Sequence, residues 1–410
     1  MPFESAEEAS DQRAEPATAR RASTPQLVLR WFALLCIPFI LAAGWSFVSA
    51  LRASSNLSTT ERTVEWLRGH HYGDTVSQVE GWYYSRNQPS TGGTLSTLPA
   101  AVSNGKPTQV TAAGQAKTPT TTGTTGTTGT TLDAEGITPL AANPLPGEGV
   151  WQPYGDFTSG QPAMQVTYMR PDDIHGSLLA AVVRIDQTAV SFRMIPGSIE
   201  PGGSWPSSTQ LSDQNRSSLL AAFNSGFRIA DAHGGFAMAG QMSGALRDGG
   251  ATAAISSNGT LTIGMWGRDI GASDNPTAVR QNLDLIVDDG KLVDGLDSNA
   301  GNRWGKTVGN ALYVWRSGMG VDAKGRIIYV ASKGLTVKTL AALLQRAGAV
   351  RAMELDINYS WVTFNSFHHN GDGTISGTKL LNNMKKSANR YLTPDARDYF
   401  AVIARAPIGH

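Results

Sequence analysis

The residues best suited to chemistry lie in an acidic segment, residues 351–358, near the C-terminal end of the chain. Its sequence, Arg-Ala-Met-Glu-Leu-Asp-Ile-Asn, alternates in polarity and predicts a β-strand with Glu354 and Asp356 on one face. At about 3.3 Å per residue, their Cα atoms would lie about 7 Å apart. Like charges that close push their pKa values apart, so one carboxyl group can keep its proton near neutral pH. Glycosyl transfer uses such a pair, and the alternative is an ordinary amphipathic strand with a solvated acidic face.

A second candidate is the turn formed by residues 224–227, Asn-Ser-Gly-Phe, which is followed by further glycines at 234, 235 and 240. Glycine lets the backbone approach a ligand closely, and the asparagine amide offers both donors and acceptors. The composition is typical of a ligand-binding turn, and also of a tight turn between two strands.

A third candidate is the segment 316–320, Arg-Ser-Gly-Met-Gly, which lies between two segments rich in β-forming residues. A buried arginine in a glycine-rich segment suits a phosphate or a carboxylate, because its planar guanidinium donates two parallel hydrogen bonds. The alternative is a surface arginine before a loop. No Gly-Lys-Ser/Thr follows, which excludes a P-loop.

The order of these three clusters resembles that of the phosphodiester glycosidase family, over about residues 175–405. This family includes an N-acetylglucosamine-1-phosphodiester α-N-acetylglucosaminidase and bacterial exopolysaccharide-associated proteins. Its Asn-Gly-Gly-Phe-Phe motif is similar to residues 224–228, its Arg-Thr-Ala-x-Gly motif to residues 316–320, and its Asn-Leu-Asp-Gly-Gly-Gly-Ser motif to residues 354–360. The matching residues are Asn224, Gly226, Phe227, Arg316, Gly320, Asp356 and Ser360.

The resemblance implies that the chain hydrolyses a sugar-1-phosphodiester at the anomeric carbon. No cofactor is expected, and no residue is assigned as a metal ligand. Asp356 and Glu354 would handle protons and the developing positive charge, and Arg316 would hold the phosphate. The expected substrate-binding residues are Asn224, Gly226, Phe227, Gly320 and Ser360.

One departure from the family pattern leaves other functions open. Residues 357–359, Ile-Asn-Tyr, replace the family's Gly-Gly-Gly run and would fill space beside Asp356. A divergent member with an altered pocket is therefore expected. The alternatives are a catalytically inactive glycan-binding or envelope-organising protein, and a glycopolymer transferase in which a sugar hydroxyl replaces water.

The N-terminal part of the chain contains an apolar run, residues 31–51, without a charged residue. Twenty-one residues of helix suffice to cross a hydrocarbon core of about 30 Å. Arginines 20, 21 and 30 precede the run, and the positive-inside rule then predicts a cytoplasmic disordered tail at 1–30 and an extracytoplasmic C-terminal domain. A single-pass cell-membrane anchor in contact with the lipid bilayer is expected, and a cleaved signal peptide is the alternative.

Between this run and the C-terminal domain, the sequence predicts a juxtamembrane segment at 52–84 and a linker at 85–146. Ten of the fourteen residues at 118–131 are threonine, and such a segment cannot bury a core. The overall charge is nearly balanced, with 34 Lys and Arg against 33 Asp and Glu, which argues against a nucleic-acid partner. A single cysteine excludes a disulfide within the chain.

Residues 147–410 are long enough for one domain with a sizeable core. Hairpins are predicted at 251–266, 283–293 and 312–331, each around a Gly-containing turn, and strands at 178–185, 190–195, 350–357 and 399–404. Only residues 337–347 have a helical period. The fold class expected is α+β, a strand-rich C-terminal domain with few helices, preceded by one transmembrane helix and a disordered Thr-rich linker.

Overall fold

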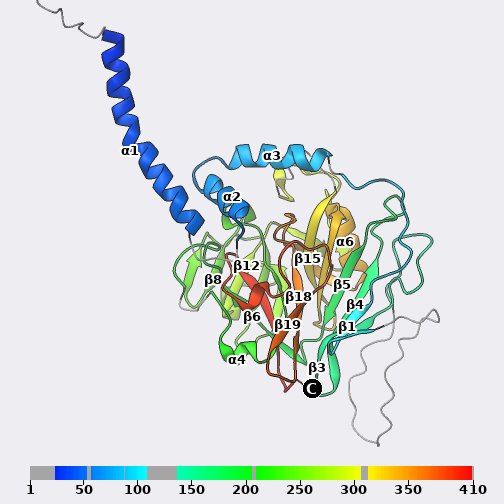
Figure 1. The fold of residues 1–410 in the computed structure, drawn as a ribbon. Helices are drawn as coiled ribbons and strands as arrows, with labels where there is room; N and C mark the ends of the chain where they lie inside the picture. Colours follow the sequence, from blue (N-terminus) through cyan, green and yellow to red (C-terminus); the bar gives the residue numbers. More distant parts are fainter. Residues whose placement is uncertain are drawn as a thin grey trace, which may run out of the picture. The chain divides into compact units, whose positions relative to one another are not determined.

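The computed structural model describes residues 24–52, 57–86, 88–108, 136–205, 209–305 and 313–408. The chain divides into two compact units, which are described separately. The described part of the first comprises α1 (Thr24–Arg52) and residues 59–66, which begin α2 (Thr59–Gly69). The second runs on from residue 67 and contains α3 (Gly73–Arg86) and three β-sheets (Figure 1).

The largest sheet has ten strands in the order β14-β13-β17-β15-β16-β5-β4-β3-β1-β2. Neighbouring strands are antiparallel, except that β1 pairs parallel to β3. The strands are β1 (Ala101–Ser103), β2 (Lys106–Thr108), β3 (Gln152–Thr158), β4 (Gln161–Met169), β5 (Ala180–Ile185), β13 (Leu285–Asp288), β14 (Lys291–Leu292), β15 (Val314–Asp322), β16 (Ile327–Leu335) and β17 (Ala349–Glu354).

Helix α6 (Val337–Arg346) packs on one face of this sheet, against β13, β15, β16 and β17. Thr336 begins it by accepting a hydrogen bond from the Thr339 amide at 3.0 Å, which satisfies one of the unpaired donors of the first turn. The apolar residues of the predicted helical period are buried in the core on this face, Leu340 and Leu344 completely. The helical expectation for residues 337–347 is therefore confirmed.

Two five-stranded antiparallel sheets complete the domain, in the orders β19-β18-β7-β20-β6 and β11-β10-β12-β8-β9. The first contains β6 (Val190–Ile195), β7 (Leu219–Asn224), β18 (Phe364–His369), β19 (Ile375–Lys379) and β20 (Tyr399–Ala404). The second contains β8 (Phe236–Met238), β9 (Gln241–Ser243), β10 (Ala251–Ile255), β11 (Leu261–Met265) and β12 (Ala278–Gln281).

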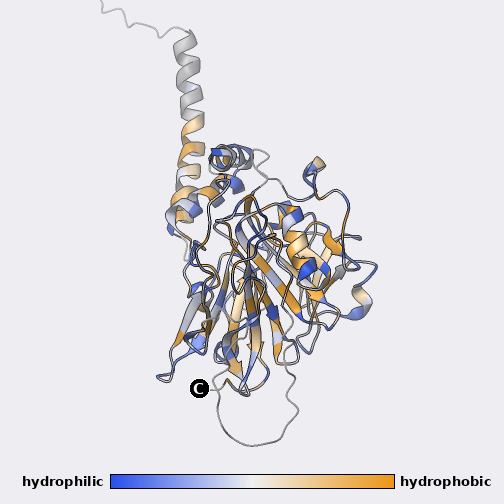
Figure 2. Ribbon diagram, turned by 90° about the vertical axis from the view of Figure 1, so that its right-hand side faces the viewer, coloured by the Kyte–Doolittle hydropathy of each residue, from blue (hydrophilic) through white to orange (hydrophobic). Residues whose placement is uncertain are grey.

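The main hydrophobic core joins these two sheets to the ten-stranded sheet, on the face opposite α6. At its centre the rings of Phe223 and Phe364 are stacked, with centroids 5.4 Å apart, and Tyr329 of β16 packs on Phe364 at 5.0 Å. Aromatic pairs of this geometry stabilise a core beyond their area burial. Figure 2 shows hydrophobic residues along the strands of the domain.

The strand-rich α+β class is confirmed, and the three predicted hairpins form as β10–β11, β13–β14 and β15–β16. One strand differs from its prediction: β17 ends at Glu354, not at residue 357. Backbone pairing with β15 still continues briefly, because Ser317 donates to the Asp356 carbonyl at 2.9 Å and accepts from the Leu355 amide at 2.8 Å. Beyond Asp356 the chain leaves the sheet as a turn.

The predicted linker at 85–146 contains structure at both ends. Strands β1 and β2 lie within it and form the edge of the ten-stranded sheet. Ile137 belongs to the core beneath α6, and its amide donates to the Gly149 carbonyl at 2.8 Å. The folded domain thus includes residues N-terminal to 147. The Thr-rich stretch 118–131, like the tail before residue 24, lies outside the described residues.

A helix, α1, forms over the apolar run at 31–51. Within the described part of the chain, no helix combines the length and the apolar character needed to cross a membrane. The expected anchor therefore has no support from the structure and stays a prediction.

Candidate active site

A cavity of about 420 Å³ in the second unit receives the side chain of Asp356. Three stretches of chain contribute most of its lining: residues 68–80 from the end of α2 and the start of α3, residues 227–231 after β7, and residues 356–361 after β17. Val314 and Arg397 complete the wall. A concave site with several convergent polar groups is the usual form of a small-molecule site.

Asp356 is held by the end of the β15–β17 pairing. Its amide donates to Ser317 Oγ at 3.2 Å, and its Oδ1 accepts from the amide of Asn358 at 2.8 Å. The residue is 5% exposed, and burial raises the pKa of its carboxyl group to about 7, while the charges of Arg397 and Arg68 oppose the rise. A carboxyl group with this pKa has both protonation states available near neutral pH, which suits general acid–base chemistry.

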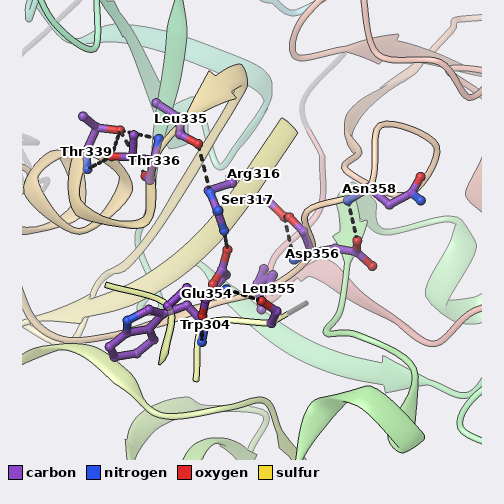
Figure 3. A network of polar contacts seen from close by, with 12 residues as sticks. Trp304, Arg316, Ser317, Leu335, Thr336, Thr339, Glu354, Leu355, Asp356 and Asn358 are labelled. Atoms are coloured by element: carbon purple, nitrogen blue, oxygen red, sulfur yellow. Dashed lines mark hydrogen bonds and ion pairs between the residues drawn. The ribbon is translucent and has the colours of Figure 1, made fainter. Parts of the chain in front are cut away.

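Arg316 and Glu354 do not line this cavity. They form an ion pair in the interior, where Arg316 Nε also donates to the Leu335 carbonyl at 2.9 Å. In Figure 3 Arg316 bridges Glu354 and the Leu335 carbonyl, whereas the Asp356 carboxylate lies apart from this pair and beside Asn358. The expectation that Glu354 and Asp356 lie on one strand face assumed a strand that continues to residue 357. Because β17 ends at Glu354, the two carboxyl groups do not lie side by side.

Glu354 is fully buried, and burial raises the pKa of its carboxyl group although the Arg316 charge opposes the rise. Its Oε1 carries the ion pair, and its Oε2 has no hydrogen-bond partner among the described residues. Because both groups are withdrawn from solvent and face each other, their geometry favours a structural role over binding a substrate phosphate.

The opposite wall is the turn that follows β7. Asn282 links the two walls: its Oδ1 accepts from the Phe227 amide at 2.9 Å, and its Nδ2 donates to the Glu354 carbonyl at 2.8 Å. A Cβ at Gly226 would lie 2.7 Å from Asn282 Oδ1, so the glycine is required for this close approach. Phe227 lines the cavity as expected.

Other expected substrate-binding residues lie in the scaffold. Asn224 is buried: its Oδ1 accepts from the Thr363 amide at 3.1 Å and its Nδ2 donates to Ser317 Oγ at 3.0 Å. Gly320 faces β17, where a Cβ would lie 2.9 Å from the Arg351 carbonyl oxygen. Ser360 is buried and accepts from Lys385 Nζ at 3.2 Å. These contacts position the motif, and none of the three residues lines the cavity.

The cavity contains arginines other than the expected Arg316. Arg397 is buried with its guanidinium 4.5 Å from the centre of the Trp361 ring, and it is the main charge opposing the pKa rise of Asp356. Arg228 pairs with Glu200 at 3.1 Å. Arg228 and Trp361 directly follow matched motif residues, and this position could have indicated from sequence that they line the site. Nothing in the sequence around Arg397 indicates such a role.

Residues 68–80 were assigned from sequence to a juxtamembrane segment, and the structure brings them to the site. Arg68 pairs with Glu80 at 2.7 Å, and both line the cavity with His71. Nothing in their spacing indicates this role, because only the tertiary fold brings α3 near Asp356. Across the described residues, no group of three or more His, Cys, Asp or Glu is arranged to hold a metal ion.

Comparison with known proteins confirms the resemblance. Residues 217–356 match the model of the phosphodiester glycosidase family, which supports a glycosidase-type function for this domain. No curated protein matches the chain.

The solved structures that match the chain have low sequence identity and low TM-scores. One is the catalytic domain of zebrafish N-acetylglucosamine-1-phosphodiester α-N-acetylglucosaminidase, auto-inhibited by its pro-peptide (19% identity, 62% of this chain and 87% of that chain, TM-score 0.39). Another is a hypothetical protein from Synechocystis (16% identity, 62% of each chain, TM-score 0.33).

Proposed function

We propose that the domain hydrolyses sugar-1-phosphodiesters, with Asp356 as the acid–base residue. The observation that carries the proposal is a buried carboxyl group with a pKa near 7, placed in a cavity beside a buried arginine, at the end of the segment that matches the family model. Strongly perturbed carboxyl groups in clefts are typical of functional sites.

In this reaction the bond between the anomeric carbon and the phosphate oxygen breaks, and water adds to the carbon. The products are the free sugar and a phosphomonoester. Protonated Asp356 gives a proton to the departing oxygen, or its ionised form takes one from the attacking water, and the negative charge supports the positive charge that develops on the sugar. Asp74, Glu80 and Asp231 are the other carboxyl groups that line the cavity.

Arg397 is the residue that we assign to the phosphate, in place of Arg316. Its planar guanidinium can donate two parallel hydrogen bonds, and Trp361 holds the plane in position. Arg397→Lys keeps the charge but loses the planar guanidinium and its contact with the Trp361 ring. We expect it to raise KM for a sugar-1-phosphodiester about tenfold, with a smaller effect on a neutral aryl glycoside of the same sugar.

The control for this measurement is Arg303→Lys, since Arg303 forms a surface ion pair with Asp284 and lines no part of the cavity. Equal losses on the charged and the neutral substrate in Arg397→Lys would mean that Arg397 supports the fold and does not hold the phosphate.

The decisive assay uses a chain of residues 57–410, since residues 68–80 line the cavity and β1 belongs to the sheet. It should release free sugar from at least one member of a panel of α- and β-linked sugar-1-phosphodiesters, and Asp356→Asn should do so about 10²–10⁴-fold more slowly. If the unmodified protein binds these compounds without releasing sugar, the glycan-binding alternative replaces the enzyme. Tyr359 at a position that is glycine in the family favours that alternative.

Location outside a membrane, and cell-surface glycans as substrates, are proposals that rest on the sequence pattern of residues 20–51. With Cys36→Ser as background, Thr125→Cys should react with an impermeant maleimide on intact cells that express the full chain. Reaction only after lysis would contradict this orientation.

A further inference from the structure

Two more hollows adjoin the cavity that holds Asp356. The first, of about 240 Å³, shares Val314 with that cavity, and the second, of about 480 Å³, shares Lys333 with the first. All three belong to the second unit of the chain. Each hollow therefore borders the next through a shared lining residue, and we call the two further hollows the groove.

The middle hollow is rich in aromatic side chains. It is lined by Tyr83, Tyr313, Trp315 and Tyr359, together with Val314 and Lys333. Tyr83 is 52% exposed and Tyr359 is 38% exposed, while Tyr313 and Trp315 are half-buried. Such rings offer an apolar face and a polar edge, and the apolar C–H face of a sugar ring packs well on them. Exposed aromatic side chains beside a glycosidase-type cavity therefore suit a sugar unit.

The start of β15 and the end of β16 position three of the residues that line this hollow. Tyr313 and Trp315 flank Val314 at the start of β15, and Lys333 lies near the end of the paired strand β16. Val314 pairs with Leu335, and the register shifts between Val314 and Arg316. This irregularity lies where β15 enters the sheet, beside the cavity that Val314 also lines.

Charge distinguishes the groove from the cavity. The cavity is lined by charges of both signs, four carboxyl groups and three arginines, whereas the two further hollows are lined by Lys333 and Lys379 and by no carboxyl group. Lys333 is exposed, and it forms no ion pair within the part of the chain that the structure describes. A site with lysines and without carboxylates favours an anionic ligand.

We propose that the groove binds a polymer of sugars joined by phosphodiesters. One sugar beyond the cleaved bond packs in the aromatic hollow, and the following phosphodiester lies against Lys333. This inference rests on the proposed function and extends it, because it names a polymer as the substrate. Its consequence is that a chain of several units is a better substrate than a single sugar-1-phosphodiester.

The kinetic test compares a synthetic oligomer of four hexose units joined by 1-phosphodiesters with a single hexose-1-phosphodiester. Lys333→Gln and Tyr83→Ala are each expected to lower kcat/KM for the oligomer about tenfold and to leave the single-unit value unchanged. Losses that are equal for both substrates, or absent for both, overturn the groove.

Two matched controls lie outside the groove. Trp82→Ala removes the exposed aromatic residue next to Tyr83, and Lys291→Gln removes an exposed lysine on β14 of the same sheet. Neither side chain lines a hollow of the groove. Both should keep the kcat/KM values of the unmodified protein on both substrates. A tenfold loss in either control would mean that the effect is not specific to residues of the groove.

A binding measurement separates failure of the groove from failure of the proposed function. With Asp356→Asn as the background, calorimetry should show the oligomer binding at least tenfold more tightly than either the single unit or maltotetraose, a neutral oligosaccharide of the same length. Lys333→Gln should remove most of this difference. If this selectivity is found while no variant or substrate gives hydrolysis, the groove stands and the enzyme does not. Equal affinity for the oligomer and maltotetraose overturns the anionic-polymer assignment.

Discussion

Asp356→Asn is expected to lower kcat for hydrolysis of a sugar-1-phosphodiester by about 10²–10⁴-fold, the usual contribution of a general acid or base. Asparagine keeps the shape and can still accept the hydrogen bond from the Asn358 amide, so the loss reports the proton and the charge. In the unmodified protein, the pH profile of kcat/KM should have one limb near pH 7, because burial raises the pKa of Asp356 to about 7. That limb should be absent from the residual activity of the variant.

The same substitution should change how stability depends on pH. The ordinary pKa of this carboxyl is 3.8, so between about pH 4 and 7 the folded protein holds a proton that the unfolded chain releases. Stability therefore falls as pH rises through this window, by an amount on the order of 4 kcal/mol when complete. Thermal unfolding at pH 5 and pH 8 should check this. The Tm of Asp356→Asn relative to that of the unmodified protein should be higher at pH 8 than at pH 5.

Asp231→Asn is the matched control for both measurements, since Asp231 also lines the cavity but lies on the exposed side of α5 (Ile229–Ala232). Because its side chain is exposed, this substitution should leave the rate of hydrolysis and the free energy of unfolding nearly unchanged. If Asp356→Asn and Asp231→Asn behave alike in activity and in unfolding, Asp356 is not the titrating group of the site.

Glu354→Gln is expected to lower the free energy of unfolding by about 3–5 kcal/mol, because it leaves the Arg316 charge buried without its partner. For a domain of this size the loss corresponds to a fall in Tm of about 10 °C. Below the new Tm, the pH profile of hydrolysis should keep its midpoint near 7, since Glu354 does not line the cavity. A shift of that midpoint would restore the view that Glu354 and Asp356 titrate as a coupled pair.

Two comparisons test whether the buried pair is the cause. Combining Glu354→Gln with Arg316→Met removes both charges and should recover part of the lost stability. Asp297→Asn breaks an exposed ion pair with Lys338 and should cost at most about 1 kcal/mol. If the double variant is less stable than Glu354→Gln by the full cost of Arg316→Met alone, the two residues do not stabilise the fold as a pair.

Local sequence patterns determined much of the scaffold. Hairpins formed where β-rich runs flank Gly-containing turns, and α6 formed where apolar residues recur every three or four positions, because turn chemistry and hydrophobic period act over a few residues. The Asn-x-Gly-Phe turn and the Asp356 segment were also found from sequence, through their short motifs. The structure shows why Gly226 is needed there, because a Cβ would lie 2.7 Å from Asn282 Oδ1.

The division of roles among the charged residues was decided only by the tertiary structure. Glu354 and Asp356 are two positions apart, yet the end of β17 between them sends one carboxyl to Arg316 in the interior and the other into the cavity. Arg397, residues 68–80 and Lys333 come from distant parts of the chain and reach the site or the groove through pairing and packing. A short motif identifies the residues that its own segment needs. The burial and the neighbouring charges that set a pKa depend on residues that only the folded chain brings together.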